Sequence, residues 1–450
     1  MCASIFLDLS LPNAATWFYA SFLLAVTLFV RFDRPLSLRN WDIVALWLII
    51  PGLLYLQDGH AMRAELSEPL RDLKRAFSRS DKYFRNGYIW LMAASGYWFL
   101  RCMFDLGLEK RPMLPPNISV AGMTCLAASL VVCLTAAAAK KPAEEDLDRT
   151  RVPVAVAKAN DGAAALVKMK NGQVPKDTAG TRFWIGRAGA VLAHLVVVAG
   201  LVMIGARTYG DAMTGMAMGC LYLLLPCTAY DVIKIHHVWP SLFFLGAVYW
   251  HRRPAVAGAL LGVAAGSVFF PALLFPLWFG FYRGRGAGRF AAGFLAALGL
   301  SLGVTAALLS FEGELGQYLK VARSLSDWQA WKAPTAFSIW RGTHWAYRLP
   351  VFIAYMAFIV LTMVWPSPRH LGQVIAQSAA VVIGVQFWYA EQGGTYVLWY
   401  APLLLLMIFR PNLTDARPPE IGPGPGPIRS WLIRRLKASG RPPAAVPASS

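Results

Sequence analysis

Charged residues are scarce in this chain, and acidic residues are the scarcest. Only 15% of the 450 residues are charged, with 24 Asp and Glu against 43 Lys and Arg. Soluble domains carry about a quarter charged residues, so this composition excludes an ordinary cytosolic enzyme. The aromatic content, 17 Trp, 16 Tyr and 25 Phe, is far too high for a chain that is disordered over most of its length.

Common catalytic motifs are also missing. No segment fits G-x-x-x-x-G-K-[ST], H-E-x-x-H or G-x-S-x-G, so P-loop NTPases, zincins and α/β-hydrolases have no support. The six cysteines form no C-x-x-C pair and no Cys/His spacing typical of zinc. The net charge of +19 is explained more simply by an anionic membrane face than by nucleic acid, and no nucleic-acid partner is predicted.

Long, continuous hydrophobic runs are what the chain does contain. A helix needs about 20 apolar residues to cross a membrane, and continuous rather than alternating runs exclude a membrane β-barrel. We therefore predict an all-α, multi-pass transmembrane helical bundle of about 11–13 spans. The runs lie at about 14–30, 41–56, 87–104, 118–139, 184–206, 213–230, 238–250, 254–282, 287–310, 348–365, 371–390 and 393–409.

The run at 254–282 carries arginines at both ends. Arg252 and Arg253 precede it, and Arg283 and Arg285 follow it. Because basic residues mark the cytoplasmic side, both ends are predicted to lie inside, although the run is too short for two full spans. A helical hairpin that turns near 267–271 fits this pattern, and one long tilted helix is the alternative.

The basic loops also orient the other runs. No Lys or Arg precedes the first run, whereas Arg31, Arg34 and Arg39 follow it, so the N-terminus is predicted outside and the 31–40 loop inside. Counting onward places 57–86, 139–183, 231–238, 311–347 and 390–394 outside. The cytoplasmic side then carries Arg207, Arg252, Arg369 and the C-terminal tail. The membrane that the chain crosses is predicted to be the cell (inner) membrane.

Two units follow from composition. Residues 1–411 form the membrane domain, with outer loops at 57–86 and 311–347 and a polar, flexible insertion at 140–182. Residues 412–450 are a basic, Pro/Gly-rich cytoplasmic tail of disordered composition. Within 57–86, apolar residues at helical spacing predict an amphipathic helix lying in the membrane interface, or alternatively packing on the bundle. These residues are Met62, Leu66, Leu70, Leu73 and Phe77.

The richest polar cluster is the short outer segment from Asp231 to Pro240. Lys234, His236 and His237 follow Asp231 in it, and such side chains can bind a phosphate, a metal or a sugar hydroxyl. Two adjacent histidines point in different directions, so alone they make a poor metal pair. The alternative is a solvated loop anchored by Trp239.

Carboxylates with aromatic neighbours mark two further outer positions. Asp58 follows the second run, where it could accept a proton from an approaching hydroxyl. Glu391 and Gln392 follow Trp388 and Tyr389, and aromatic faces beside a carboxylate suit carbohydrate. The alternatives are a helix-terminal acid and an interfacial aromatic belt. In the loop 311–347, Trp328 and Trp345 could close a lid over an acceptor.

The stretch from His251 to Phe279 reads H-R-R-P-A-V-A-G-A-L-L-G-V-A-A-G-S-V-F-F-P-A-L-L-F-P-L-W-F. It resembles a segment of bacterial polyprenol-phosphate-mannose-dependent mannosyltransferases, integral-membrane enzymes of the GT-C class. The closing segment with Trp399, Tyr400 and Pro402 resembles the last helix of that family. The resemblance extends over about 210–411, and Val268 stands near a position where relatives usually carry Lys.

The resemblance implies a GT-C-like fold and a hexosyltransferase, with mannose the expected sugar. Its partners would be a polyprenyl-phosphate sugar donor, membrane lipids and a glycan, lipid or protein acceptor. Asp58, or Glu391 in its place, would deprotonate the acceptor hydroxyl. Lys234, His236 and His237 would stabilise the leaving phosphate, with Phe270 near it.

The expected substrate contacts are Trp328, Trp345 and Gln392. A divalent cation is optional in this class, and no clear ligand set for one is present. The alternatives are a secondary transporter and a non-catalytic component of envelope polysaccharide assembly. The transporter has less support, because no inverted repeat is visible.

Overall fold

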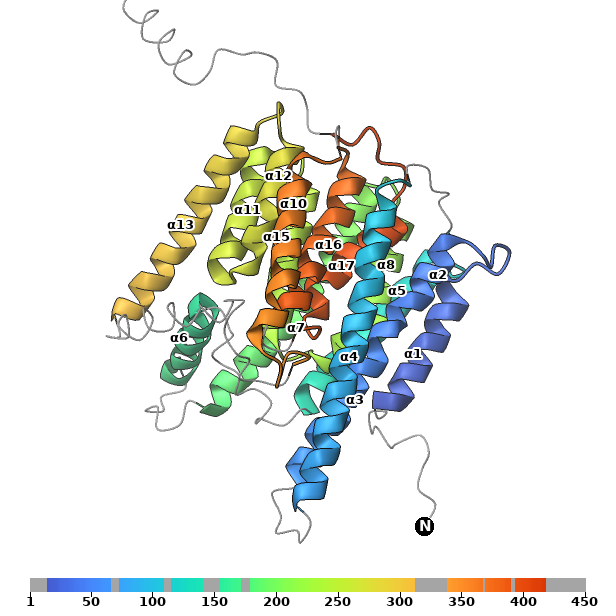
Figure 1. Cartoon of the computed structure of the whole chain (residues 1–450), viewed down its shortest axis with the longest axis vertical. Coiled ribbons are helices and arrows are strands. Elements are labelled where there is room, and N and C mark those ends of the chain that lie inside the picture. The colour runs from blue at the N-terminus through green and yellow to red at the C-terminus, as the bar shows by residue number, and fades with distance from the viewer. Residues whose placement is uncertain are drawn as a thin grey trace, which may run out of the picture.

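The computed structural model describes residues 14–65, 73–108, 115–140, 154–170, 179–311, 338–366, 369–389 and 393–417. Every regular element in these ranges is a helix (Figure 1), which confirms the all-α prediction. The α-helices of the first half are α1 (Ala14–Phe29), α2 (Leu38–Ala45), α3 (Ile50–Glu65), α4 (Leu73–Asp105), α5 (Val120–Lys140), α6 (Val154–Lys170), α7 (Ala179–Arg207) and α8 (Ala212–Leu224).

The second half contains shorter helices between longer ones. These are α9 (Pro226–Tyr230), α10 (Ile235–Tyr249), α11 (Pro254–Ser267), α12 (Phe275–Phe281), α13 (Ala287–Phe311), α15 (Leu349–Val364), α16 (Leu371–Trp388) and α17 (Val397–Phe409). Three 3-10 turns, η1 (Leu46–Ile49), η4 (Phe270–Leu274) and η6 (Trp345–Tyr347), complete the described elements.

Six helices in the described part of the chain are long and apolar enough to cross a membrane. The protein is therefore a multi-pass membrane protein by helix length and composition. These helices cover Leu38–Arg63, Val120–Lys140, Phe183–Arg207, Ala287–Ser310, Trp345–Val364 and Leu371–Trp388. Shorter apolar helices, such as Thr16–Phe29, Pro254–Ser267 and Val397–Phe409, pack among them.

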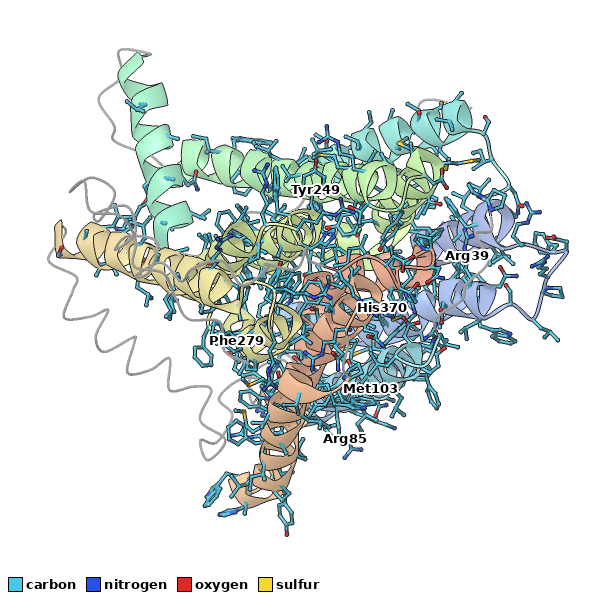
Figure 2. All side chains as sticks on the ribbon, turned by 90° about the horizontal axis from the view of Figure 1, so that it is seen from above. Arg39, Arg85, Met103, Tyr249, Phe279 and His370 are labelled. Carbon is cyan, nitrogen blue, oxygen red and sulfur yellow. The ribbon has the colours of Figure 1, made fainter. Side chains whose placement is uncertain are left out.

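The core of the bundle is formed by α16 and α17. The apolar window of α16 is 94% buried, against 17% for α5 and for α13, and every residue of α17 is buried. Seen from above, His370 at the start of α16 lies well inside the bundle, whereas α13 reaches its edge (Figure 2). The peripheral helices therefore present their apolar side chains outward, as a lipid environment allows.

Hydrogen bonds between loop segments show that the basic loops lie at one end of the bundle. The Asn117 side chain donates to the carbonyl of Val30 at 2.7 Å, and Gln373 donates to the carbonyl of Leu106 at 3.3 Å. Arg369 Nη1 donates to the carbonyl of Leu277 at 3.0 Å. The loops after α1, α4, α12 and α15 therefore share this end, as the distribution of arginines predicts.

The opposite end joins the segments that were predicted to lie together outside. Asp81 on α4 lies 3.5 Å from Arg63 on α3 and 4.0 Å from Arg341. Trp340 Nε1 donates to the carbonyl of Phe387 at 2.9 Å, at the end of α16. The described parts of 57–86 and 311–347 therefore lie on one side of the bundle.

The run at 254–282 is the predicted hairpin. Helix α11 ends at Ser267, Val268 is extended, and the chain returns through η4 and α12. The hydroxyl of Tyr282 donates to the carbonyl of His251 at 2.6 Å, so both ends of the run meet. A single tilted helix across 254–282 is excluded. Pro271 in the first turn of η4 lacks the N–H that a continuous helix needs there.

Close packing places the hairpin against α13. A Cβ added at Gly258 would collide with the carbonyl of Phe290, and one added at Gly262 would collide with that of Phe294. Four residues further along α11, the contact lies four residues further along α13. The two helices therefore run side by side in the same direction. Glycine allows this approach because the two backbones can touch without an intervening side chain.

The predicted interfacial helix through 62–77 is wrong. Helix α3 continues to Glu65, and the chain reverses before α4, which begins at Leu73. The Ser80 hydroxyl donates to the carbonyl of Gly59 at 3.1 Å, so the two helices pack as an antiparallel pair (Figure 1). Met62 belongs to α3, whereas Leu73 and Phe77 belong to α4, so these residues do not share one helix. Leu66 and Leu70 lie outside the described residues.

Two boundaries also differ from the prediction. The insertion predicted to be flexible contains α6, which packs against α7 and α13. The membrane domain continues beyond 411, because the Leu371 amide donates to the carbonyl of Ala416 at 2.9 Å. Residues 418–450 of the predicted tail and 312–337 of the outer loop lie outside the described residues.

Candidate functional site

A buried ion-pair cluster follows α9. Lys234 Nζ lies 3.1 Å from Asp231 Oδ1, and His237 Nδ1 lies 3.6 Å from Asp231 Oδ2. The side chains of Asp231 and His237 are 1% and 4% exposed, whereas that of Lys234 is 29% exposed. A buried carboxylate is costly unless it is paired, so Asp231 holds two cationic or proton-donating groups in place.

The local sequence explains this placement. Pro226 begins a new helix directly after α8, and α9 lasts only to Tyr230. The chain then turns, because the amide of Lys234 donates to the carbonyl of Asp231 at 2.9 Å and that of His237 to the carbonyl of Lys234 at 3.0 Å. The spacing of three residues in this turn brings the Lys234 ammonium beside the Asp231 carboxylate.

Aromatic rings surround the cluster on the side of α17. The His237 ring stacks on Tyr396 with centroids 5.2 Å apart. Tyr396 in turn lies 4.5 Å from Trp399, and Trp399 lies 5.9 Å from Phe270. Phe270 also lies 4.7 Å from Tyr389. We refer to Phe270, Tyr389, Tyr396 and Trp399 as the aromatic wall.

Hydrogen bonds fix the wall to the cluster. Trp399 Nε1 donates to the carbonyl of His236 at 2.9 Å. Trp239 Nε1 donates to Ser267 Oγ, also at 2.9 Å, and so joins α10 to the tip of the hairpin. The site therefore combines α10, the hairpin tip, Tyr389, the 393–396 segment and α17, which are far apart in the sequence.

Four predicted site residues are brought together by this fold. They are Lys234, His236, His237 and Phe270. The ring of Trp345 lies 5.3 Å from His344 in the 338–348 segment, and no ring contact joins it to the aromatic wall among the described residues. Trp328, Glu391 and Gln392 lie outside the described residues.

The predicted base, Asp58, is exposed on α3. Helix α3 continues past it to Glu65, so Asp58 does not end a helix as its position after a hydrophobic run suggested. Within the described ranges it forms no ion pair with the cluster. The structure thus supplies a second carboxylate, Asp231, at the site itself.

Part of the site was not predicted from the sequence. Asp231 was within the recognised polar segment, three residues before Lys234, and that spacing was the available signal. Tyr396 was recognised only as part of the closing segment, and Tyr389 only as a neighbour of Glu391. Their convergence with Phe270 depends on tertiary packing over more than a hundred residues, for which one sequence carries no signal.

The described residues contain no group of three or more His, Cys, Asp or Glu side chains suited to holding a metal ion. Within them, the cluster has one carboxylate, and the rings of its neighbouring histidines are tilted by 53° with their centroids 4.5 Å apart.

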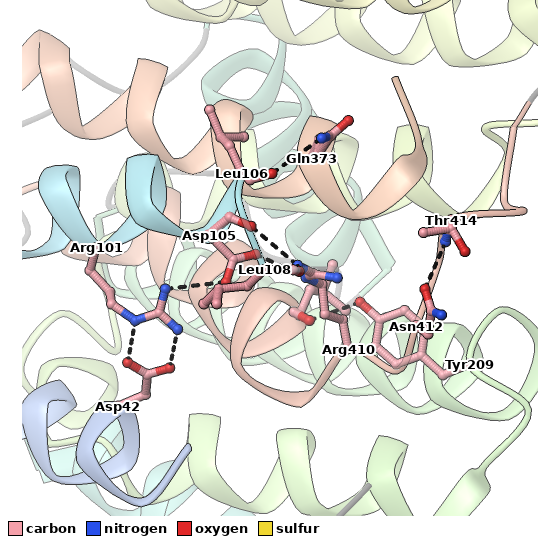
Figure 3. Close-up of polar contacts among 11 residues, drawn as sticks. Asp42, Arg101, Asp105, Leu106, Leu108, Tyr209, Gln373, Arg410, Asn412 and Thr414 are labelled. Atoms are coloured by element: carbon pink, nitrogen blue, oxygen red, sulfur yellow. Dashed lines mark hydrogen bonds and ion pairs between the residues drawn. The ribbon is translucent and has the colours of Figure 1, made fainter. Parts of the chain in front are cut away.

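A second buried network lies at the opposite end of the bundle (Figure 3). Arg101 makes a two-pronged contact with Asp42, at 2.6 Å for each nitrogen–oxygen pair. Its remaining nitrogen lies 3.2 Å from Asp105, and Asp105 accepts from Arg410 Nε at 2.9 Å. The network links α2, α4 and the end of α17, and it was not predicted from the sequence.

His370 lies beside this network, in the loop before α16. Burial and the positive charges of Arg410 and Arg417 lower the pKa of His370 to about 4. The imidazole is therefore neutral at physiological pH, and it adds no further positive charge next to the two arginines.

No protein-family model, curated protein or solved structure matches this chain.

Proposed function

We propose that this protein transfers a hexose, with mannose the expected sugar, from a polyprenyl-phosphate donor to an acceptor hydroxyl at the outer face of the cell membrane. The observation that carries the proposal is the Asp231–Lys234–His237 cluster beside the aromatic wall. Cationic groups suit the phosphate of a lipid-linked sugar, and aromatic rings suit the apolar faces of the sugar and the prenyl chain.

The chemistry follows from the positions of these groups. The acceptor oxygen attacks the anomeric carbon and forms the new glycosidic bond, while the bond from that carbon to the phosphate oxygen breaks. The phosphate leaves with the electron pair, and the acceptor proton passes to a carboxylate. Lys234 and His237 stabilise the charge that develops on the leaving phosphate.

Asp231 has a positioning role in this scheme. The buried Asp231 carboxylate lies 3.1 Å from the Lys234 ammonium group, and this ion pair is what the buried carboxylate needs as compensation. It therefore orients Lys234 and His237, and the base is assigned to Asp58 or Glu391, which the sequence places on the same outer side.

A GT-C-like architecture is part of the same proposal. Its support is the helical bundle with short, broken helices at the outer end, and the hairpin whose tip carries Phe270. A donor that is itself a lipid can enter from the bilayer, so the enzyme needs no nucleotide-binding domain, and the sequence contains no nucleotide-binding motif.

The test is a transfer assay with the full-length protein in proteoliposomes. Defined polyprenyl-phosphate hexoses are added with lipid or glycan acceptors, and products are analysed by mass. The proposal predicts an acceptor mass increased by one hexose and release of polyprenyl phosphate in equal amount. Uptake of a free sugar into the vesicles without any product would contradict it.

A further inference from the structure

Exposed arginines gather where the hairpin closes. Arg252 and Arg253 precede α11, and Arg283 and Arg289 flank the turn into α13; all four side chains are exposed. The 2.6 Å hydrogen bond from Tyr282 to the carbonyl of His251 joins the two loops. The four arginines therefore belong to one surface, which we term the hairpin-base patch.

No ion pair joins these four arginines to a carboxylate within the described residues, and no Asp or Glu occurs from 232 to 311 in the sequence. By contrast, partly exposed Arg31 at the same end of the bundle lies 3.0 Å from Asp33, and buried Arg101 is paired with Asp42. In the part of the chain that the structure describes, the hairpin-base patch therefore presents positive charge without an ion-paired carboxylate.

The helices beneath the patch add to its positive potential. Both α11 and α13 begin here and run in the same direction, as the contacts at Gly258 and Gly262 require. The positive ends of two helix dipoles therefore point toward the arginines. Because dipoles and side chains have the same sign, the surface favours an anion more strongly than scattered arginines would.

The position of the patch along the bundle axis indicates that the anion is a phospholipid headgroup. Trp250 is 38% exposed, and Arg253 lies 4.8 Å from the centre of its ring. Exposed tryptophan beside arginine, at the end of apolar helices, is typical of the headgroup region of a bilayer. The arginines therefore lie where phospholipid phosphates are concentrated.

We propose that the hairpin-base patch binds the phosphate headgroups of anionic phospholipids in the leaflet at this end of the bundle. The bound headgroups hold the base of the hairpin, whose tip carries Phe270 at the other end. This assignment depends only on the surface charge and its level in the membrane, and not on the transfer reaction.

The experiment compares three double variants of the full-length protein in neutral-lipid nanodiscs with increasing phosphatidylglycerol content. R252Q/R283Q removes two charges from the patch. R31Q/R34Q removes two charges at the same end of the bundle, where Asp33 lies close by. Bound phosphatidylglycerol is counted by native mass spectrometry, and R252K/R283K tests whether charge alone suffices.

Each basic residue near an anionic surface changes affinity by about fivefold, so R252Q/R283Q is expected to bind phosphatidylglycerol about 25-fold more weakly than wild type. R31Q/R34Q is expected to change binding less than threefold, and R252K/R283K to retain most of it. Equally weakened phosphatidylglycerol binding in R252Q/R283Q and R31Q/R34Q, or unchanged binding in both, would contradict the proposal that the hairpin-base patch binds these lipids. Full competition by millimolar inorganic phosphate would overturn the assignment to lipid.

Discussion

The Tyr282 hydroxyl donates to the carbonyl of His251 at 2.6 Å, across 31 residues of chain. Both residues are buried, at 0% and 4% exposure. The bond closes the hairpin that carries Phe270 at its tip, and it fixes the two arginine-bearing loops beside each other. The hairpin therefore extends from the candidate site at its tip to the charged surface at its base.

Removing this hydrogen bond should destabilise the protein measurably. Tyr282→Phe leaves the ring in place but removes the donor to a buried carbonyl. A lost bond of this kind costs about 1–3 kcal/mol, and the thermal unfolding midpoint in detergent should fall. Tyr347→Phe is the control, because Tyr347 is 72% exposed. Equal midpoints for Tyr282→Phe and wild type would show that this bond does not hold the hairpin.

The buried network gives a second stability prediction. Asp105→Asn removes the carboxylate that faces both Arg101 and Arg410, so Arg410 loses its ion pair with Asp105, while Arg101 keeps Asp42. Breaking a buried pair from one side costs about 3–5 kcal/mol, and thermal or denaturant unfolding of the purified protein measures it. Asp33→Asn breaks an exposed pair and should change stability little. A small effect for Asp105→Asn would mean that water reaches the network.

His370 makes stability depend on pH. Its folded pKa of about 4 lies below the usual value of about 6.5, so the unfolded chain binds the proton first. As pH falls from about 6.5 toward 4, the unfolded state takes up a proton that the folded state does not, and stability decreases.

The measurement is the unfolding midpoint at pH 7.5 and at pH 5.0. His370→Asn removes this titration, so its midpoint should fall less between the two values than that of wild type. The variant His60→Asn, at an exposed position on α3, serves as the control. Identical pH dependence in wild type and His370→Asn would contradict the neutral buried imidazole.

The sequence predicts the membrane class, the shared end of the basic loops and the hairpin, because hydropathy and arginine position encode them directly. The antiparallel pairing of α3 and α4 was not predicted, since the helical spacing of apolar residues in the sequence continues from one helix into the other. The aromatic wall was missed for a different reason. Phe270 and Trp399 contact each other only because separate helices converge, and apolar residues give no signal about their distant partners.

The sequence leaves two candidates for the catalytic base, Asp58 and Glu391, and one substitution at each position distinguishes them. Asp58→Asn keeps the size of the side chain but accepts no proton, and it should lower hexose transfer by about 10²–10⁴-fold without loss of folding. Glu391→Gln is made in parallel, and turnover of both is measured with saturating donor. Wild-type turnover in Asp58→Asn together with loss in Glu391→Gln would move the base to the segment after α16. Wild-type turnover in both variants would show that neither carboxylate accepts the proton of the acceptor hydroxyl.

The central claim is that the cluster after α9 stabilises the leaving phosphate, and hexose transfer by Lys234→Gln tests it most directly. Lys82→Gln, at an exposed position on α4, is the matched control. Loss of one donor to a developing charge lowers turnover by about 10–10³-fold, so Lys234→Gln should show this loss while Lys82→Gln matches wild type. Equal transfer by all three proteins, or no transfer by wild type with any polyprenyl-phosphate hexose, would contradict the account.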